Sequence, residues 1–216
     1  KIFFVGNTMI DTLMAYLDKA LETGIHERVG VEKGSYALLT LHRPSNVDAA
    51  EVLGRVLDAV EWIQSRMKVI FPVHPRTAER IREFGLSARL SEMRNLHRLP
   101  PLGYLEFLAL TARARLVLTD SGGIQEETTV LGVPCVTLRW NTERPVTVRE
   151  GTNVLAGNDP SRIISAVREI LDDKEMPGRK PKLWDGKSAK RIVEVIQGYG
   201  GALSEHRGNE ENTGGK

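Results

Sequence analysis

Residues 115–138 read RLVLTDSGGIQEETTVLGVPCVTL, and this stretch decides the fold. It contains two short apolar runs, RLVLT (115–119) and VPCVTL (133–138), separated by DSGG and the helix-length segment IQEETTVL (124–131). Apolar runs this short are typical of strands that are buried on both faces. The stretch therefore predicts a strand, a crossover helix and a second strand in a parallel sheet.

The same alternation continues on both sides of this stretch. We expect further strands at residues 35–42, 68–74 and 95–99, and helices at residues 7–21, 48–66, 77–84, 103–114, 161–171 and 187–197. This order predicts an α/β fold, a Rossmann-like doubly wound parallel sheet without internal repeats. We expect one domain over residues 1–203 and a disordered, glycine-rich polar tail over residues 204–216.

The composition restricts the function classes. Thirty Lys and Arg residues against 28 Asp and Glu residues give a formal charge of +2, too balanced for a nucleic-acid surface built on bulk charge. The single cysteine, Cys135, lies in an apolar run, so we expect it to fill the core rather than form a disulfide or a metal site. No segment approaches the roughly 20 apolar residues of a membrane span, so we expect a cytoplasmic protein with no membrane partner.

The DSGG turn predicts an anion site. Ligands of open parallel sheets bind beyond the carboxyl ends of the strands, and Gly122 and Gly123 allow a ligand close to the backbone N–H groups of the following helix. Ser121 adds a hydroxyl donor, so phosphate is the expected occupant. Glu126 and Glu127 would repel phosphate unless they face another part of the ligand, and a carboxylate accepts hydrogen bonds from a ribose diol. Phosphate and ribose together indicate a nucleotide, although the acids can also simply complement the helix dipole.

Other strand ends point to the same edge of the sheet. His42 and Arg43 follow the strand at residues 35–42, and His74 and Arg76 follow the strand at residues 68–74. A strand-end histidine is commonly structural, but two such pairs beside a Gly-Gly turn favour a diphosphate site. The histidines lack the short spacing of a zinc site, and no carboxylate cluster suits a hard cation, so we expect no metal and no cofactor.

Residues 139–145, RWNTERP, follow the strand at residues 133–138. Arg139 and Arg144 can stabilise charge that develops on a departing diphosphate, and the alternative is a surface pair between Glu143 and Arg144. Tyr104 and Phe107, one helical turn apart, are core candidates, and one of them can stack on a base.

These motifs together resemble the non-hydrolysing UDP-N-acetylglucosamine 2-epimerases. The similarity runs through GNTMIDTL, HRPSN, FPVHP, PPLGYLEFL, TDSGGIQEE, LGVPCVTLR, NTERP and GTNVLAGND. The resemblance implies the C-terminal half of a GT-B arrangement, in which two Rossmann-like domains face each other across a cleft, and it implies a homodimer. The chain begins at a lysine, so we expect a piece of such a protein without its N-terminal domain.

The resemblance also implies roles for individual residues. Ser121, Gly122 and Gly123 match the diphosphate contacts, Glu127 matches the ribose contact, and Phe107 matches the residue beside uracil. His42 and Arg144 match catalytic positions near the phosphates and the sugar. His74 and Arg139 complete the expected substrate-binding set.

The implied reaction inverts the second carbon of the sugar without a redox cofactor. UDP departs as the proton on that carbon is removed, an enzyme-held 2-acetamidoglucal forms, and protonation on the opposite face with return of UDP gives the manno epimer. The family's acid/base carboxylates belong to the N-terminal domain, so we expect this chain alone to bind UDP without turnover. The alternatives are a GT-B glycosyltransferase donor domain and a non-catalytic nucleotide-sugar-binding module.

Overall fold

The computed structural model describes residues 1–172 and 178–198, which form two compact units. One unit is Tyr16–Pro181 and holds the whole sheet, and the other combines Lys1–Ala15 with the segment from Lys182 onward. Helix α1 (Thr8–Leu21) runs from the second unit into the first. The predicted tail at residues 204–216 and the domain end at residue 203 lie outside the described residues, so these boundaries stay predictions.

The larger unit contains a six-stranded sheet in which every neighbouring pair is parallel, in the order β3-β2-β1-β4-β5-β6. The strands are β1 (Tyr36–Thr40), β2 (Lys68–Pro72), β3 (Leu96–Leu99), β4 (Leu116–Thr119), β5 (Cys135–Thr137) and β6 (Asn153–Leu155). This is the Rossmann strand order, with the reversal of chain direction across the sheet between β1 and β4. The predicted fold class is confirmed.

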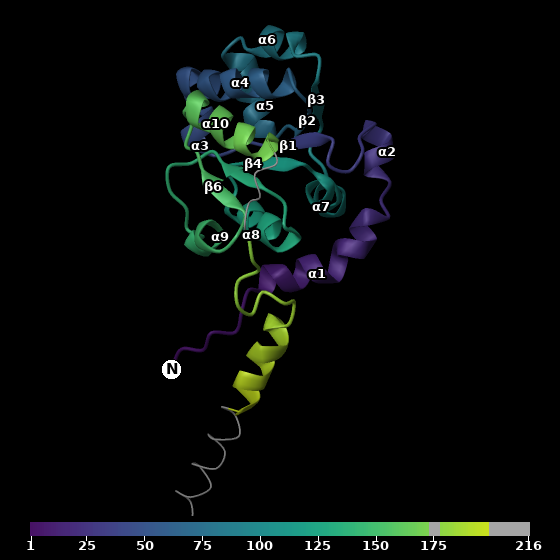
Figure 1. The fold of residues 1–216 in the computed structure, drawn as a ribbon, viewed down its shortest axis with the longest axis vertical. Helices are drawn as coiled ribbons and strands as arrows, with labels where there is room; N and C mark the ends of the chain where they lie inside the picture. The colour runs from purple at the N-terminus through teal and green to yellow at the C-terminus, as the bar shows by residue number, and fades with distance from the viewer. Residues whose placement is uncertain (173–177, 199–216) are drawn as a thin grey trace, which may run out of the picture. The chain divides into compact units, whose positions relative to one another are not determined.

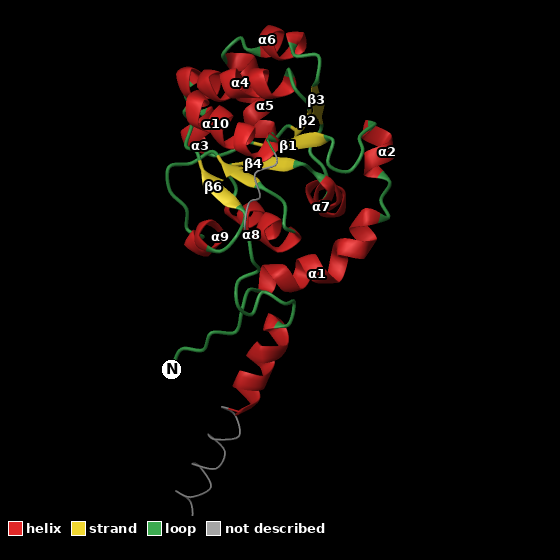
Figure 2. Cartoon of the chain, in the orientation of Figure 1, coloured by secondary structure: helices red, strands yellow, loops and turns green. Residues whose placement is uncertain are grey.

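Helices cover both faces of this sheet (Figures 1 and 2). The helices α4 (Ala50–Gln64), α5 (Pro75–Glu83) and α10 (Pro160–Leu171) lie over one face, with α7 (Tyr104–Arg113), α8 (Gly122–Leu131) and α9 (Pro145–Arg149) over the other. The core on the first face joins Leu39, Phe71 and Leu118 of the strands to Leu53 and Ile163 of the helices. Because both faces are buried, the strands read as continuous apolar runs rather than as alternating ones.

Several expectations differ from the structure in detail. Helix α8 begins at Gly122 rather than at Ile124, because Ser121 is the N-cap and both glycines adopt helical backbone angles. The sequence analysis missed the short helices α2 (Ile25–Val29), α3 (Pro44–Val47), α6 (Ser87–Glu92) and α9, and the three-residue strand β6. The missed helices have only four to six residues, too few to show a helical period, and β6 lies in the short segment TNVLAG rather than in a longer apolar run.

The smaller unit is held by contacts between segments that are distant in sequence. The backbone N–H groups of Ser188 and Ala189 donate to the carboxylate of Asp11 at 3.0 and 2.6 Å, which caps the helix at residues 188–198. Apolar side chains remain exposed on this unit, including Ile2, Phe4, Val193 and Ile196. In the described part of the chain no helix has the length and hydropathy needed to cross a bilayer.

Candidate functional site

The start of α8 lies at the carboxyl end of β4, beside the switch point of the sheet. Ser121 is the N-cap residue, yet its side chain makes no capping hydrogen bond. The nearest atom to a Cβ built on Gly122 is a Glu143 carboxylate oxygen, Oε2, at 4.0 Å. No other described side chain therefore fills the space beside the backbone of Gly122, where a ligand can approach. Free N–H groups, an unused hydroxyl and the positive end of the helix dipole make this helix start a candidate anion site.

A buried carboxylate that the sequence analysis did not select joins this helix start to the end of β1. Asp120 is fully buried and accepts hydrogen bonds from the backbone N–H of His42 at 3.0 Å and of Arg43 at 2.8 Å. Its Oδ1 lies 3.0 Å from Nδ1 of His42. Burial acts to raise the pKa of Asp120, but the hydrogen bonds from His42 and Arg43 outweigh it and hold that pKa below its usual value. The position directly after an apolar strand was the available signal for this residue.

His42 and His74 are brought together, with ring centroids 5.5 Å apart. His74 is the N-cap of α5, and its Nδ1 accepts the backbone N–H of Arg76 at 3.2 Å. The side chain of Arg76 instead forms an ion pair with Asp48. Arg76 is therefore engaged by a carboxylate, whereas both predicted histidines lie at the sheet edge.

Glu126 and Glu127 are both buried on α8 but have different partners. Glu126 pairs with Arg144, with Oε1 and Nε 2.7 Å apart. Burial raises the pKa of Glu127 to about 7, with a hydrogen bond from Tyr104 opposing this rise and the charge of Glu126 adding to it. One oxygen of Glu127, Oε2, is buried without a hydrogen-bond partner. An acceptor in this state is ready for a ligand hydroxyl.

In the segment after β5, the ion pairs differ from the Glu143–Arg144 pair that the sequence left open. Glu143 pairs with Arg139 and not with Arg144, through two hydrogen bonds of 2.7 and 2.8 Å. The alternative of a Glu143–Arg144 pair is therefore wrong, because Arg144 turns toward Glu126 on α8. Phe107 is half-buried on α7, which packs against α8.

A buried network of uncharged side chains fixes the backbone of Arg144. Gln125, fully buried, accepts hydrogen bonds through Oε1 from Thr142 at 2.6 Å and from the Asn153 amide at 3.1 Å. Thr142 in turn accepts the N–H of Arg144 at 2.9 Å, and Thr147 donates to the carbonyl of Arg144 at 2.7 Å. Gln125 was quoted in the motif but was not selected, because its partners lie 17 and 28 residues away.

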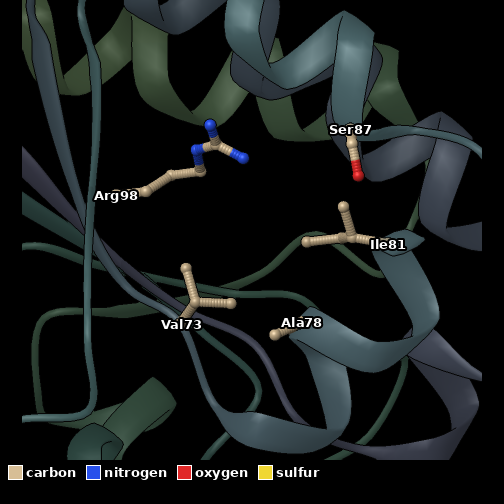
Figure 3. Close-up of a pocket in the computed structure, with 5 residues that line it drawn as sticks. All are labelled: Val73, Ala78, Ile81, Ser87 and Arg98. Atoms are coloured by element: carbon tan, nitrogen blue, oxygen red, sulfur yellow. The ribbon is translucent and has the colours of Figure 1, made fainter.

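A separate hollow of about 370 Å³ lies between α5, α6 and the end of β3 (Figure 3). Its lining residues are Val73, Ala78, Ile81, Ser87 and Arg98, and none of them belongs to the predicted site. In this view the Arg98 side chain extends across the hollow, the Ser87 hydroxyl points into it, and Val73, Ala78 and Ile81 lie on the opposite side. The described residues contain no group of three or more His, Cys, Asp and Glu side chains that could hold a metal ion.

Replacing Gln125 by leucine is expected to lower the free energy of unfolding by about 2 kcal/mol. Leucine has a similar size but leaves the Thr142 hydroxyl and the Asn153 amide without their acceptor. Chemical denaturation measures this loss. The matched control is Gln197→Leu at an exposed helical position, which should shift stability by less than about 0.5 kcal/mol; equal losses in both variants would contradict the assigned network.

Glu127 is expected to make stability depend on pH. Its folded pKa of about 7 lies above the ordinary value of 4.5, so the folded state keeps a proton that the unfolded state releases between these values. Stability should therefore fall by about 3 kcal/mol as the pH rises from 4.5 to 7. In Glu127→Gln the free energy of unfolding, measured by chemical denaturation at each pH, should no longer fall across this range. Glu79→Gln at an exposed site should keep the fall. A slope unchanged in Glu127→Gln would rule out the raised pKa.

The family model described as UDP-N-acetylglucosamine 2-epimerase matches residues 1–197. The UDP-N-acetylglucosamine 2-epimerase of Methanocaldococcus jannaschii is 44% identical over 202 residues, covering 91% of this chain and 54% of that protein. The crystal structure of the M. jannaschii enzyme in complex with UDP-GlcNAc and UDP aligns with a TM-score of 0.82 at 41% identity, covering 91% of this chain and 55% of that one. The Neisseria meningitidis enzyme bound to UDP-GlcNAc aligns with a TM-score of 0.78 at 31% identity, with the same coverage of 91% and 55%.

The chain spans about half the length of the curated relatives it matches. The matched region includes both units of the described structure and every motif at the sheet edge. By sequence and by fold, the chain belongs to the UDP-N-acetylglucosamine 2-epimerase family.

Proposed function

We propose that this chain is the UDP-binding half of a UDP-N-acetylglucosamine 2-epimerase, one of the two Rossmann-like domains of a GT-B arrangement. The observation that carries the proposal is the uncapped start of α8 at the switch point, with the acceptor oxygen of Glu127 one helical turn further on. An anion site and a hydroxyl acceptor at this spacing suit a diphosphate joined to a ribose. Relatives whose structures contain UDP or UDP-GlcNAc share this part of the chain.

The diphosphate would bind at Ser121, Gly122 and Gly123, where backbone N–H groups and the helix dipole favour negative charge. Arg139 lies on the segment beside this helix start and would add a cationic donor. These groups would stabilise the charge on UDP as its bond to the sugar breaks.

The nucleoside would extend from the diphosphate toward α7. Glu127 would accept hydrogen bonds from the ribose hydroxyls through its unpartnered oxygen, and Phe107 would stack beside uracil. Tyr104 on the same helix is hydrogen-bonded to Glu127, so it would help to position the carboxylate that faces the ribose.

The two residues in catalytic roles would act on the departing UDP and the sugar. His42 is oriented through Nδ1 by the buried carboxylate of Asp120, which directs its other ring nitrogen away from the core. Arg144 is fixed both by its pair with Glu126 and by the backbone network of Gln125. His74 would support the ligand from the neighbouring strand end.

In the proposed reaction the base that removes the proton from the second carbon of the sugar belongs to an N-terminal domain. The exposed apolar residues Ile2, Phe4, Val193 and Ile196 would pack in the longer protein. The homodimer and the cytoplasmic location stay predictions.

UDP binding tests the proposal most directly. Gly122→Ala should leave the fold intact, because the added methyl group meets no atom closer than 4.0 Å and alanine favours a helix. The same methyl group would crowd a phosphate at the first turn, so calorimetry should show an affinity for UDP at least about tenfold lower. Gly54→Ala, at a similarly open position in α4, is the matched control and should bind UDP like the parent chain. Equal affinity of all three proteins would place the phosphate elsewhere.

The 216-residue chain should not interconvert UDP-GlcNAc and UDP-ManNAc by itself. Proton NMR of UDP-GlcNAc incubated with the chain should show no second epimer, while the full-length M. jannaschii enzyme provides the positive control. Accumulation of the manno epimer would contradict the assignment of the base to another domain. Transfer of the sugar to an added acceptor would favour the glycosyltransferase alternative.

A further inference from the structure

The carboxylate of Glu143 lies at the place proposed for the diphosphate. Its Oε2 is the nearest atom, at 4.0 Å, to a Cβ built on Gly122, the first residue of α8. Both carboxylate oxygens are held by Arg139, through hydrogen bonds of 2.8 and 2.7 Å. The side chain of Arg139 is only 12% exposed, so the guanidinium is fixed while Glu143 itself is 56% exposed on its outer side.

The surroundings of Glu143 are those of an anion site. The hydrogen bonds from Arg139 lower its pKa to about 2, and the positive charge of Arg43 contributes in the same direction. Arg43 has a buried Nε without a hydrogen-bond partner, and the hydroxyl of Ser121 makes no capping bond. The carboxylate thus satisfies Arg139 but leaves two nearby donors unused.

A carboxylate has too few oxygens to satisfy all of these donors. Its two oxygens are both bound to Arg139, whereas a diphosphate has enough oxygens to reach Arg139, Ser121 and the N–H groups of α8 together. A dianionic or more highly charged group also gains more from two arginines and a helix dipole than a monoanion does. A diphosphate can therefore displace the Glu143 carboxylate. A ligand with a single carboxylate makes no more hydrogen bonds than Glu143 already makes.

We propose that Glu143 is a specificity-determining residue whose carboxylate occupies the anion site of the unliganded protein and is displaced by a diphosphate. The inference rests on the proposed UDP site at α8. Because the carboxylate must be displaced before any anion binds, only an anion that reaches more donors than Glu143 does can recover this cost. If Glu143 instead stayed in place and oriented Arg139 toward the ligand, removing its charge would weaken anion binding rather than strengthen it.

The test compares the 216-residue chain with Glu143→Gln and with Glu83→Gln. Glu83 is the matched control because it also pairs with an arginine, Arg80, in an exposed ion pair on the surface of the same unit. Calorimetry measures binding of UDP and of inorganic pyrophosphate to all three proteins, and thermal melts confirm that each is folded. Glu143→Gln should bind both ligands about fivefold more tightly, the change expected when one exposed ion pair no longer has to be broken. The control should change by less than about twofold.

A second readout follows Glu143 directly. In ¹³C-carboxyl NMR the pKa of Glu143 should rise from about 2 toward its ordinary value of 4.5 when UDP saturates the chain, because the displaced carboxylate loses Arg139. A pKa that stays near 2 in the complex would overturn the inference. Equal or weaker binding of both ligands to Glu143→Gln would also overturn it.

The outcomes separate this inference from the proposed function. Tighter binding of pyrophosphate to Glu143→Gln, with no binding of UDP to any of the proteins, would keep the role of Glu143 and refute the nucleotide site. UDP binding to the parent chain with weaker binding to Glu143→Gln would keep the nucleotide site and refute the displacement. Failure of both ligands to bind any of the proteins would refute both.

Discussion

The site depends on one buried charge, the carboxylate of Asp120. Besides the backbone of His42 and Arg43, it accepts the side-chain amide of Asn46 at 3.2 Å, and the same amide donates to the carbonyl of Leu138 at 2.8 Å. The ends of β1, β4 and β5 are therefore joined through two side chains. A buried carboxylate is costly unless hydrogen bonds satisfy it, so these loops cannot separate without exposing or stranding that charge. These hydrogen bonds therefore hold the loops that carry the candidate site residues in fixed positions relative to the sheet.

The first two turns of helix α8 carry the other residues of the candidate site. Residues four apart lie on the same face of a helix, so Glu126 and Glu127 follow Gly122 and Gly123 one turn later. Gln125 points to a different side, where it fixes the segment that carries Arg144. A single helix thus places the anion site, the hydroxyl acceptor and the cationic segment, and a rotation of this helix would misplace all three together.

The parallel α/β fold and the choice of Ser121, Gly122 and Gly123 as a candidate anion site could be argued from the sequence, because both depend on local patterns. Runs of five to eight mostly apolar residues indicated the strands, and Ser-Gly-Gly after a strand indicated a helix start open to a ligand. The pairings were not predictable from spacing. Asp120 and His42 are 78 residues apart, and their contact follows only from the adjacency of β1 and β4. The partner of Glu143 could not be chosen from sequence either, because Arg139 and Arg144 are both close in the chain and only the fold directs one of them to Glu126.

The carboxylates at this edge of the sheet have different partners, and these partners limit which of them could act as a base. Asp120 is enclosed by donors, Glu126 faces Arg144, and Glu143 is bound to Arg139. Glu127 has the raised pKa that suits proton transfer, but it lies on the side of α8 that meets Tyr104, which under the proposed binding mode is the nucleoside end of the ligand rather than the sugar. A base for the second carbon of the sugar must approach from the opposite end of the diphosphate. Under the proposed function, the described groups at the site would bind UDP and stabilise its negative charge as it departs, and proton removal would require a carboxylate from an N-terminal domain.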